Sequence, residues 1–489
     1  MSSNNQNMLY KIMNFSSISI FTIFIIFTVQ FVDVGAEDLP DLEKTIEYSN
    51  LPIILDDDFK VEKFVTDLNV PITIEFLGDD LLVLQKNDGK VRLIRNGVLQ
   101  AEPVLDVEVS NYGERGLLGI TSKDSTVYLF FTEAYHDGGL ALGNHVYAYT
   151  WNGEKLVEPR LVKALPGWTT AYNGGVLATD LDKNVYLTSG SQYKFGILQN
   201  FSQSESYFCP DENICDSNNS LPFSDSVSNT LSCINVSFHH YTTNPFSWQD
   251  HQPDVSVNPW ETNPFFVLGN IQSCLKAFIN DNFSNGTWHD TSVISQIEPD
   301  YDYVAIGTRN SFGLAVDPVT GNLWMTENGP DNYDEINLIP GKSNLGWAKY
   351  VGPVDEESVS TVLGYEEYVY KNPEFSWELP IGITGLSFAD SEMFKKYSNW
   401  LFVTDSTVGN IYKFKLNTER TGFIFSDPNL KDLVVNIDPE NRSGYLHEKM
   451  DEILFGINFG VVTDLEFGPD GAMYVVSIMD GTIYRITLQ

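Results

Sequence analysis

The sequence predicts an all-β protein, a six-bladed β-propeller, from three observations. A two-strand phrase recurs six times, with an aromatic-rich strand, a polar turn containing Gly or Asn, and a second aromatic-rich strand. A further apolar strand, the innermost of its unit, comes before each phrase. About 50 residues are available per hairpin, close to the repeat of a four-stranded blade. Because only a neighbouring copy can cover the apolar face of each unit, the units should close into a ring.

The six phrases are distributed along the whole chain. The hairpins occupy residues 78–94, 125–151, 183–191, 321–339, 399–416 and 471–488. The innermost strands are predicted at 70–76, 113–120, 172–180, 309–317, 382–388 and 461–467. Since the last hairpin ends at the C-terminus, an early strand at 60–66 is expected to complete the final blade and remove its free edge.

The N-terminal region is predicted to direct export. Residues 12–34 are mostly apolar and lead into small residues before an acidic stretch, as in a signal peptide. The length of this run also allows a retained membrane anchor. The chain therefore divides into a leader or anchor (1–36), an acidic linker (37–59) and the propeller (60–489). The expected location is secreted or extracellular, with or without the anchor.

Residues 194–300 have a different composition and are predicted to be an insertion between blades three and four. All four cysteines lie in it: Cys209, Cys215, Cys233 and Cys274. An even number in an exported protein indicates two disulfides of open pairing, with a zinc site as the alternative. Beyond the leader, six N-x-S/T sequons make the chain a candidate glycoprotein, at Asn200, Asn218, Asn235, Asn282, Asn285 and Asn441.

The charge of the chain excludes one large class of partner. Against 29 Lys and Arg stand 66 Asp and Glu, which gives a formal net charge of -37. Such a surface repels phosphate backbones, so nucleic-acid binding is not expected. The hydrophobic content of 42% is sufficient for a large core and excludes a disordered chain.

Function is expected at the mouth of the ring. Antiparallel neighbours reverse direction, so the start of each innermost strand and the end of the next strand lie on one face. The strand starts bring to this face Thr73, Glu114, Arg115, Tyr172, Asn173, Arg309, Asn310, Thr384 and Asp464. The loops that follow add Lys86, Glu133, His136, Gln192, residues 327–330 and Asp405. Convergence of distant segments is typical of a ligand site.

Two features of this mouth indicate a chemistry. Arg309, followed by Asn310, offers a rigid fork to a carboxylate or oxyanion, with an inter-blade salt bridge as the alternative. Residues 326–337 combine a Gly-Pro turn with several acidic residues, whose oxygens suit calcium unless the turn is simply solvated. The candidate metal residues are Gly329, Pro330, Asp334 and Glu335.

The same stretches resemble the family of soluble glucose, aldose and sorbosone dehydrogenases, six-bladed propellers that use pyrroloquinoline quinone (PQQ) and calcium. GERGLLGI, YNGGV, VYLTSG and residues 307–347 carry the resemblance, which extends over most of 60–489 apart from the insertion. The resemblance implies that Arg309 and Asn310 bind the cofactor, and Asn173 and Thr384 are assigned to the same site. It also implies that the carbonyls of Gly329 and Pro330 bind calcium.

The chain departs from this family at the catalytic pair. Where the family has the His that removes a proton from the sugar hydroxyl, and its partner Asp, this chain has Tyr172 and Ser191. A phenol with a reference pKa near 10 is a poor base at neutral pH. Three cation positions that would hold the cofactor's carboxylates carry Thr407, Val461 and Thr463, each a loss of roughly 1.5–3 kcal/mol.

The sequence therefore predicts an exported sugar dehydrogenase-like oxidoreductase that uses PQQ and calcium. Its candidate catalytic residues are Tyr172, Ser191 and Glu114, and its partner is a small sugar or polyol. The alternative is a non-catalytic, calcium-dependent propeller that binds a glycan or a protein. A metal-dependent lactone hydrolase using Glu114 or Glu327 is a third hypothesis, by analogy of fold alone.

Overall fold

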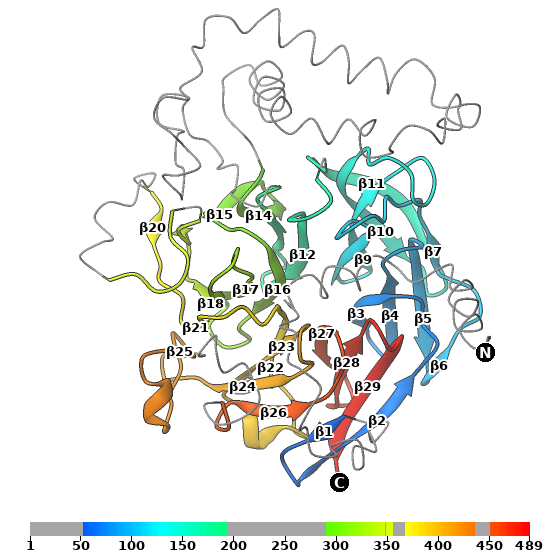
Figure 1. Cartoon of the computed structure of the whole chain (residues 1–489). Coiled ribbons are helices and arrows are strands. Elements are labelled where there is room, and N and C mark those ends of the chain that lie inside the picture. Colours follow the sequence, from blue (N-terminus) through cyan, green and yellow to red (C-terminus); the bar gives the residue numbers. More distant parts are fainter. Residues whose placement is uncertain (1–51, 168, 193–289, 348, 356–366, 436–449) are drawn as a thin grey trace, which may run out of the picture.

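The computed structural model of the chain is built almost entirely of strands. It describes residues 52–167, 169–192, 290–347, 349–355, 367–435 and 450–489. In these ranges the strands form six sheets arranged around an axis (Figure 1). Two short 3-10 helices are η4 (Lys395–Tyr397) and η5 (Pro428–Leu430). The prediction of an all-β propeller is confirmed.

The innermost strands surround the axis. They are β3 (Pro71–Leu77), β8 (Leu117–Lys123), β12 (Gly174–Thr179), β16 (Ser311–Val316), β22 (Ile383–Phe388) and β27 (Val462–Phe467). Each lies at the end of its sheet and contacts the next innermost strand, and β27 contacts β3 to close the ring. These strands overlap the six ranges predicted from the sequence.

Glycine allows two pairs of innermost strands to approach closely. A Cβ at Gly119 on β8 would lie 1.9 Å from the carbonyl oxygen of Gly175 on β12. A Cβ at Gly313 on β16 would lie 2.4 Å from the carbonyl oxygen of Thr384 on β22. Any other residue at these positions would force the two strands apart.

The remaining strands extend each sheet outward. The first sheet adds β4 (Asp80–Gln85), β5 (Lys90–Arg95), β6 (Val98–Leu99) and β7 (Leu105–Asp106) to β3. The second adds β9 (Thr126–Glu133), β10 (Gly143–Trp151) and β11 (Leu156–Leu165) to β8. The third adds β13 (Val185–Ser189), β14 (Val293–Glu298), β15 (Asp302–Ile306), β19 (Ser343–Asn344) and β20 (Val369–Tyr370) to β12.

The other three sheets follow in chain order. The fourth adds β17 (Leu323–Glu327), β18 (Asp334–Ile339), β21 (Phe375–Trp377) and β25 (Val434–Val435) to β16. The fifth adds β23 (Trp400–Asp405), β24 (Ile411–Lys415), β26 (Leu454–Ile457) and β1 (Ile53–Ile54) to β22. The sixth adds β28 (Met473–Ser477), β29 (Thr482–Leu488) and β2 (Phe59–Val65) to β27.

The N-terminal strand closes the ring, as predicted. Strand β2 pairs antiparallel with β29, with Phe59 opposite Leu488. The predicted linker, however, extends too far. Strand β1 pairs with β26, and the Asp56 carboxylate accepts a hydrogen bond from the Tyr397 hydroxyl at 2.5 Å. Residues 53–59 therefore belong to the propeller, because backbone pairing and this partly buried hydrogen bond fix them.

The insertion enters at a different place from the one predicted. Strand β13 pairs directly with β14, so the segment between them interrupts the third sheet instead of separating blades three and four. Residues 293–298, predicted to be part of the insertion, form β14 itself. The four cysteines and the six sequon asparagines lie outside the described residues.

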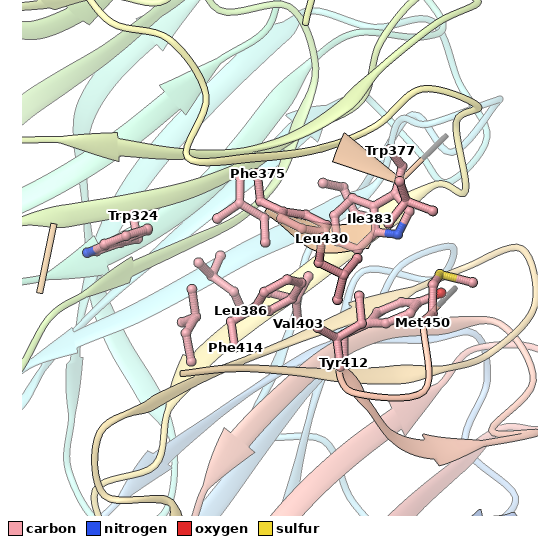
Figure 2. Close-up of a cluster of buried hydrophobic side chains, with 14 of the residues drawn as sticks. Trp324, Phe375, Trp377, Ile383, Leu386, Val403, Tyr412, Phe414, Leu430 and Met450 are labelled. Atoms are coloured by element: carbon pink, nitrogen blue, oxygen red, sulfur yellow. The ribbon is translucent and has the colours of Figure 1, made fainter. Parts of the chain in front are cut away.

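The core between the fourth and fifth sheets is rich in aromatic side chains (Figure 2). Trp324, Phe375 and Trp377 from the fourth sheet are fully buried, as are Tyr412 and Phe414 from the fifth. The Trp377 and Tyr412 rings have centroids 5.2 Å apart. Each such side chain contributes roughly 1.5–3 kcal/mol on burial, so neighbouring blades are held together by apolar packing.

None of the helices in the described part of the chain is long and apolar enough to cross a membrane. Residues 12–34, for which the sequence predicts a leader or an anchor, are outside that part.

Candidate functional site

The mouth of the ring is organised around the Arg309 guanidinium, which lies just before β16 and is 3% exposed. Its Nη1 donates to the carbonyl oxygens of Asn328 at 2.6 Å and Gly329 at 2.9 Å. Its Cζ lies 4.6 Å from the centre of the Tyr172 ring and 5.3 Å from that of the Trp347 ring. Two aromatic faces and two carbonyls therefore hold the cation in place.

Glu114 brings a carboxylate to the same position. Its Oε2 accepts a hydrogen bond from the Tyr172 backbone amide at 2.6 Å. Burial raises the pKa of Glu114, while the Tyr172 amide, the Arg309 charge, Asn310 and Lys86 partly oppose that rise. Burial also lowers the pKa of Lys86 to about 8. Glu114 is thus a half-buried acid next to a fixed cation, a setting in which a carboxyl group can exchange a proton with a ligand.

Three buried polar atoms beside Arg309 have no hydrogen-bond partner among the residues that the structure describes: Asn310 Oδ1, Glu327 Oε2 and Trp347 Nε1. Glu327 belongs to the site because its Oε1 accepts from the Arg309 amide at 2.8 Å. An unsatisfied buried polar atom costs about 1–3 kcal/mol. One N–H donor and two oxygen acceptors are the partners that hydroxyl groups require, since a hydroxyl both donates and accepts.

The three predicted catalytic residues meet at this point. Tyr172 has a left-handed backbone, with a φ of 60°. Its carbonyl accepts from the Gln192 amide at 3.1 Å, and the amide of fully buried Ser191 donates to the Arg309 carbonyl at 2.8 Å. Tyr172, Ser191 and Glu114 are therefore neighbours around Arg309, and their catalytic roles stay predictions.

Two residues predicted to contact the cofactor, Asn173 and Thr384, have protein hydrogen-bond partners. The buried Asn173 accepts through Oδ1 from Asn144 Nδ2 at 2.9 Å. The buried Thr384 donates through Oγ1 to the Val462 carbonyl at 2.9 Å. Asn173 thereby joins the second and third sheets, and Thr384 joins the fifth and sixth.

Asp334 stabilises the Gly-Pro turn through hydrogen bonds from backbone amides. Its Oδ1 accepts from the Gly329 amide at 3.0 Å, and its Oδ2 accepts from the amides of Ile381 and Gly382 at 2.8 and 2.6 Å. Burial raises the pKa of Asp334 to about 6. Because both oxygens accept from amides, Asp334 shapes the turn, and its role as a metal ligand stays a prediction.

The other predicted metal residues, Gly329, Pro330 and Glu335, have different surroundings. The Gly329 carbonyl faces Arg309, and a second positive charge there would be repelled. Pro330 is half-buried beside it. Glu335 accepts from the Gly352 amide at 2.5 Å and from Asn337 Nδ2 at 3.1 Å, and burial raises its pKa to about 7. In the part of the chain that the structure describes, no group of three or more His, Cys, Asp or Glu side chains is arranged to hold a metal.

The observed donor set does not fit a tricarboxylate quinone. Arg309 is already engaged by two carbonyls, and Glu114 adds a negative charge beside it. Thr407, Val461 and Thr463 supply no charge at the remaining positions. The free oxygens of Asn310 and Glu327 are instead the kind of donors that a hard cation such as calcium prefers.

The sequence did not single out Trp347. The residue lies in the Leu-Gly-Trp phrase at the end of the 307–347 stretch, where a tryptophan is as typical of a core as of a site. His136, considered as a mouth residue, is exposed in the loop after β9 and contacts the Asp137 carbonyl at 3.1 Å. It is not part of the group around Arg309.

Comparisons with known proteins identify relatives of this chain. The family described as Glucose / Sorbosone dehydrogenase matches residues 68–207 and 285–485, well over half of the chain. Aldose sugar dehydrogenase YliI of Escherichia coli K12 is 28% identical over 156 residues, 30% of this chain and 40% of that protein. An uncharacterized Synechocystis protein, slr1608, is 29% identical over 175 residues, 35% of each chain. The matches thus span less than half of these relatives.

Solved structures share the fold. An oxidoreductase described as a glucose dehydrogenase from Thermus thermophilus has a TM-score of 0.52 and 21% identity, covering 88% of this chain and 99% of that one. The apo form of the soluble aldose sugar dehydrogenase from Escherichia coli has a TM-score of 0.52 and 18% identity, covering 88% and 100%. At these identities the likeness concerns the propeller alone.

Proposed function

Because the chain belongs to the glucose/sorbosone dehydrogenase family, we propose that it is a sugar dehydrogenase-like propeller that binds a sugar or polyol at its mouth without the family's histidine-assisted oxidation. The observation that carries the proposal is the group of unsatisfied polar atoms around Arg309, on Asn310, Glu327 and Trp347. A hydroxyl-rich ligand supplies partners for both the donor and the acceptors. Export is part of the proposal and is supported by the apolar run at residues 12–34.

The loss of oxidation is inferred from two substitutions and from one further carboxylate at the centre of the site. The phenol of Tyr172 stacks on a guanidinium and replaces a basic imidazole. Ser191, at the position of the family's carboxylate, is fully buried and its amide is bonded to Arg309. Glu114 adds a negative charge beside Arg309, which would disfavour a carboxylate of the quinone there. Each of these three residues weakens a step of sugar oxidation. None of them removes the polar atoms that would bind the hydroxyl groups of a ligand.

Calcium is proposed as an aid to binding. The carboxylate of Glu327 and the side-chain carbonyl of Asn310 would hold it, because each has an oxygen without a hydrogen-bond partner among the described residues, and the ligand hydroxyls would then contact these two oxygens through the cation. A hard cation there would also balance the acidic pair Glu327 and Glu335, since burial and the charge of Glu335 raise the pKa of Glu327. Removing calcium should therefore weaken sugar binding.

Arg309→Met tests the mouth directly. Tryptophan fluorescence and calorimetry would be recorded for the full chain with free monosaccharides and polyols, with calcium and with a chelator. We expect binding to weaken about 10- to 100-fold in the variant, the effect of losing a charge-assisted contact of roughly 1.5–3 kcal/mol. Arg160→Met, which removes an exposed arginine from β11, is the matched control. If no sugar or polyol binds the unaltered protein, the proposal is wrong.

A second candidate function is sugar oxidation with Glu114 as the base. The observation in its favour is that the half-buried Glu114 carboxylate accepts a hydrogen bond from the Tyr172 amide, and that burial raises its pKa. We expect no dye reduction by the unaltered chain with added PQQ, calcium and a panel of sugars. Tyr172→His together with Ser191→Asp should bring turnover into detection if the missing base is what prevents it. Turnover in the unaltered chain that is abolished by Glu114→Gln would establish this second function instead.

A further inference from the structure

A cleft of about 340 Å³ opens between the first and sixth sheets, which lie side by side where the ring closes (Figure 1). On the side of the sixth sheet it is lined by Phe64 of β2 and Tyr474 of β28. On the side of the first sheet it is lined by Leu81 of β4 and Ile94 of β5. Ligand pockets usually measure roughly 300–1,000 Å³, so this cleft has room for one small organic molecule.

The cleft lies on the face of the propeller opposite the mouth. The mouth is formed where the innermost strands begin, whereas the cleft is lined by residues from the other end of two of them. Phe76 is next to the last residue of β3, and Asp79 lies in the turn between β3 and β4. Asp470 lies in the turn that follows β27. A ligand in this cleft is therefore separate from a sugar in the mouth.

Three aromatic rings form one wall of the cleft. The Phe64 and Tyr474 rings have centroids 5.0 Å apart at an interplanar angle of 78°, and the Phe76 and Tyr474 rings have centroids 5.1 Å apart at 63°. Tyr474 is only 4% exposed, while Phe64 and Phe76 are half-buried. Because two rings keep part of their surface open to the cleft, an aromatic ligand can continue the same edge-to-face packing.

Two of the charged residues that line the cleft neutralise each other. Arg485 Nε donates to Asp470 Oδ2 at 3.1 Å, and Arg485 Nη2 donates to the same oxygen. Asp470 also accepts from the Tyr474 hydroxyl at 3.0 Å and from the Ala472 amide at 3.1 Å. An anionic ligand would have to compete with Asp470 for the Arg485 guanidinium.

Asp79 is the other carboxylate that lines the cleft. It is exposed and forms no hydrogen bond or ion pair with another residue in the described ranges. The acidic surface of the whole chain, with its net charge of -37, attracts cations to the same region. A protonated amine is thus the charged group that this cleft favours.

We propose that the cleft between the first and sixth sheets binds a small aromatic amine, with its ring against Phe64 and Phe76 and its ammonium group paired with Asp79. This is a second ligand site, and it does not depend on the proposed function of the mouth. A neutral aromatic molecule would gain the apolar contacts alone, and an aromatic acid would also be repelled by Asp79.

The test uses three probes that share a phenyl ring and differ in the charge of the end group: 2-phenylethylamine, 2-phenylethanol and phenylacetate. Their binding to the full chain would be measured by ligand-observed NMR titration at neutral pH. The amine should bind about two- to fivefold more tightly than the alcohol, the range for an exposed ion pair, and the acid should bind most weakly. Asp79→Asn should remove the preference for the amine and leave the affinity for the alcohol unchanged. Asp182→Asn, in the exposed turn after β12, removes the same charge elsewhere and is the matched control.

The aromatic wall is tested by Phe64→Ala, which should weaken the binding of all three probes by about five- to tenfold. Phe64→Leu should recover part of this loss, because leucine restores an apolar side chain but not the ring. Thermal unfolding of both variants shows whether they are folded, and sugar binding at the mouth should be unchanged in both.

Four results would overturn the inference. The unaltered chain could bind none of the three probes, or it could bind the amine and the alcohol equally well. The preference for the amine could persist in Asp79→Asn, which would place the ammonium group elsewhere. The unaltered chain could also form dimers that Phe64→Ala separates, which would make the cleft an interface between copies. If the amine binds as expected and no sugar binds, the proposed function fails while this inference stands.

Discussion

Replacing Arg420 with Ala is expected to lower the free energy of unfolding by about 3–5 kcal/mol, the typical cost of leaving one partner of a buried ion pair alone. Arg420 Nε lies 2.7 Å from Asp317 Oδ2, and the two side chains are 7% and 0% exposed. Asp317 follows β16 of the fourth sheet, and Arg420 follows β24 of the fifth. The pair therefore joins two blades as well as neutralising a buried carboxylate.

Urea unfolding measures this effect. Arg420→Lys should lose less stability than Arg420→Ala, because lysine keeps the positive charge and loses only the planar set of guanidinium donors. Lys395→Ala is the matched control, since it removes a pair with Glu392 whose side chains are 74% and 88% exposed. Such surface pairs contribute about 0–1 kcal/mol. If Arg420→Ala lowers the free energy of unfolding by less than about 1 kcal/mol, the two backbone amides that donate to Asp317 are enough to stabilise its buried carboxylate.

Glu75→Gln is expected to stabilise the protein above neutral pH. Glu75 lies on β3, where burial and then the charge of Asp464 on β27 raise its pKa from 4.5 to about 7, and a hydrogen bond from Ser122 opposes this rise. Asp464, whose pKa burial raises to about 6, accepts from Thr73 Oγ1 at 2.7 Å. Glu466 is the third acid at this junction, and burial with both neighbouring charges raises its pKa well above the usual range.

The sign of the change in stability with pH follows from proton binding. Between about pH 4.5 and 7 the folded chain holds a proton on Glu75 that the unfolded chain has released, so stability falls as pH rises through this window. The single shift corresponds to roughly 2–3 kcal/mol once partial exposure to water is allowed for. Glutamine is neutral at every pH and can keep the Ser122 contact. The stability of the variant should therefore not show the fall with rising pH that Glu75 causes.

Thermal unfolding from pH 5 to 8 tests the prediction. The midpoint of the unaltered protein should fall across this range, and that of Glu75→Gln should fall less. Asp79→Asn, in the exposed turn after β3, should follow the unaltered protein. Identical slopes for Glu75→Gln and the unaltered protein would mean that Asp464 and Glu466 carry the pH dependence without Glu75.

Part of the site was predictable because the propeller repeat fixes which strand ends share a face. This rule placed Tyr172, Glu114 and Arg309 together although they lie far apart in the chain. It could not show the direction of a side chain. Asp334 looked like a cation ligand in an acidic turn, yet its oxygens face backbone amides. Trp347 gave no signal in the sequence because its role depends on a packing partner, Arg309, nearly 40 residues earlier.

The sequence alone determined the propeller and the position of its innermost strands, since strand period, turn residues and repeat length are local properties. It also determined the replacement of the family's catalytic pair, because residue identity needs no coordinates. Only the tertiary structure decided that the insertion interrupts the third sheet and that Arg309 contacts the Gly329 carbonyl. The physical reason is that pairing between distant strands and the satisfaction of buried polar groups depend on neighbours in space, which chain order does not specify.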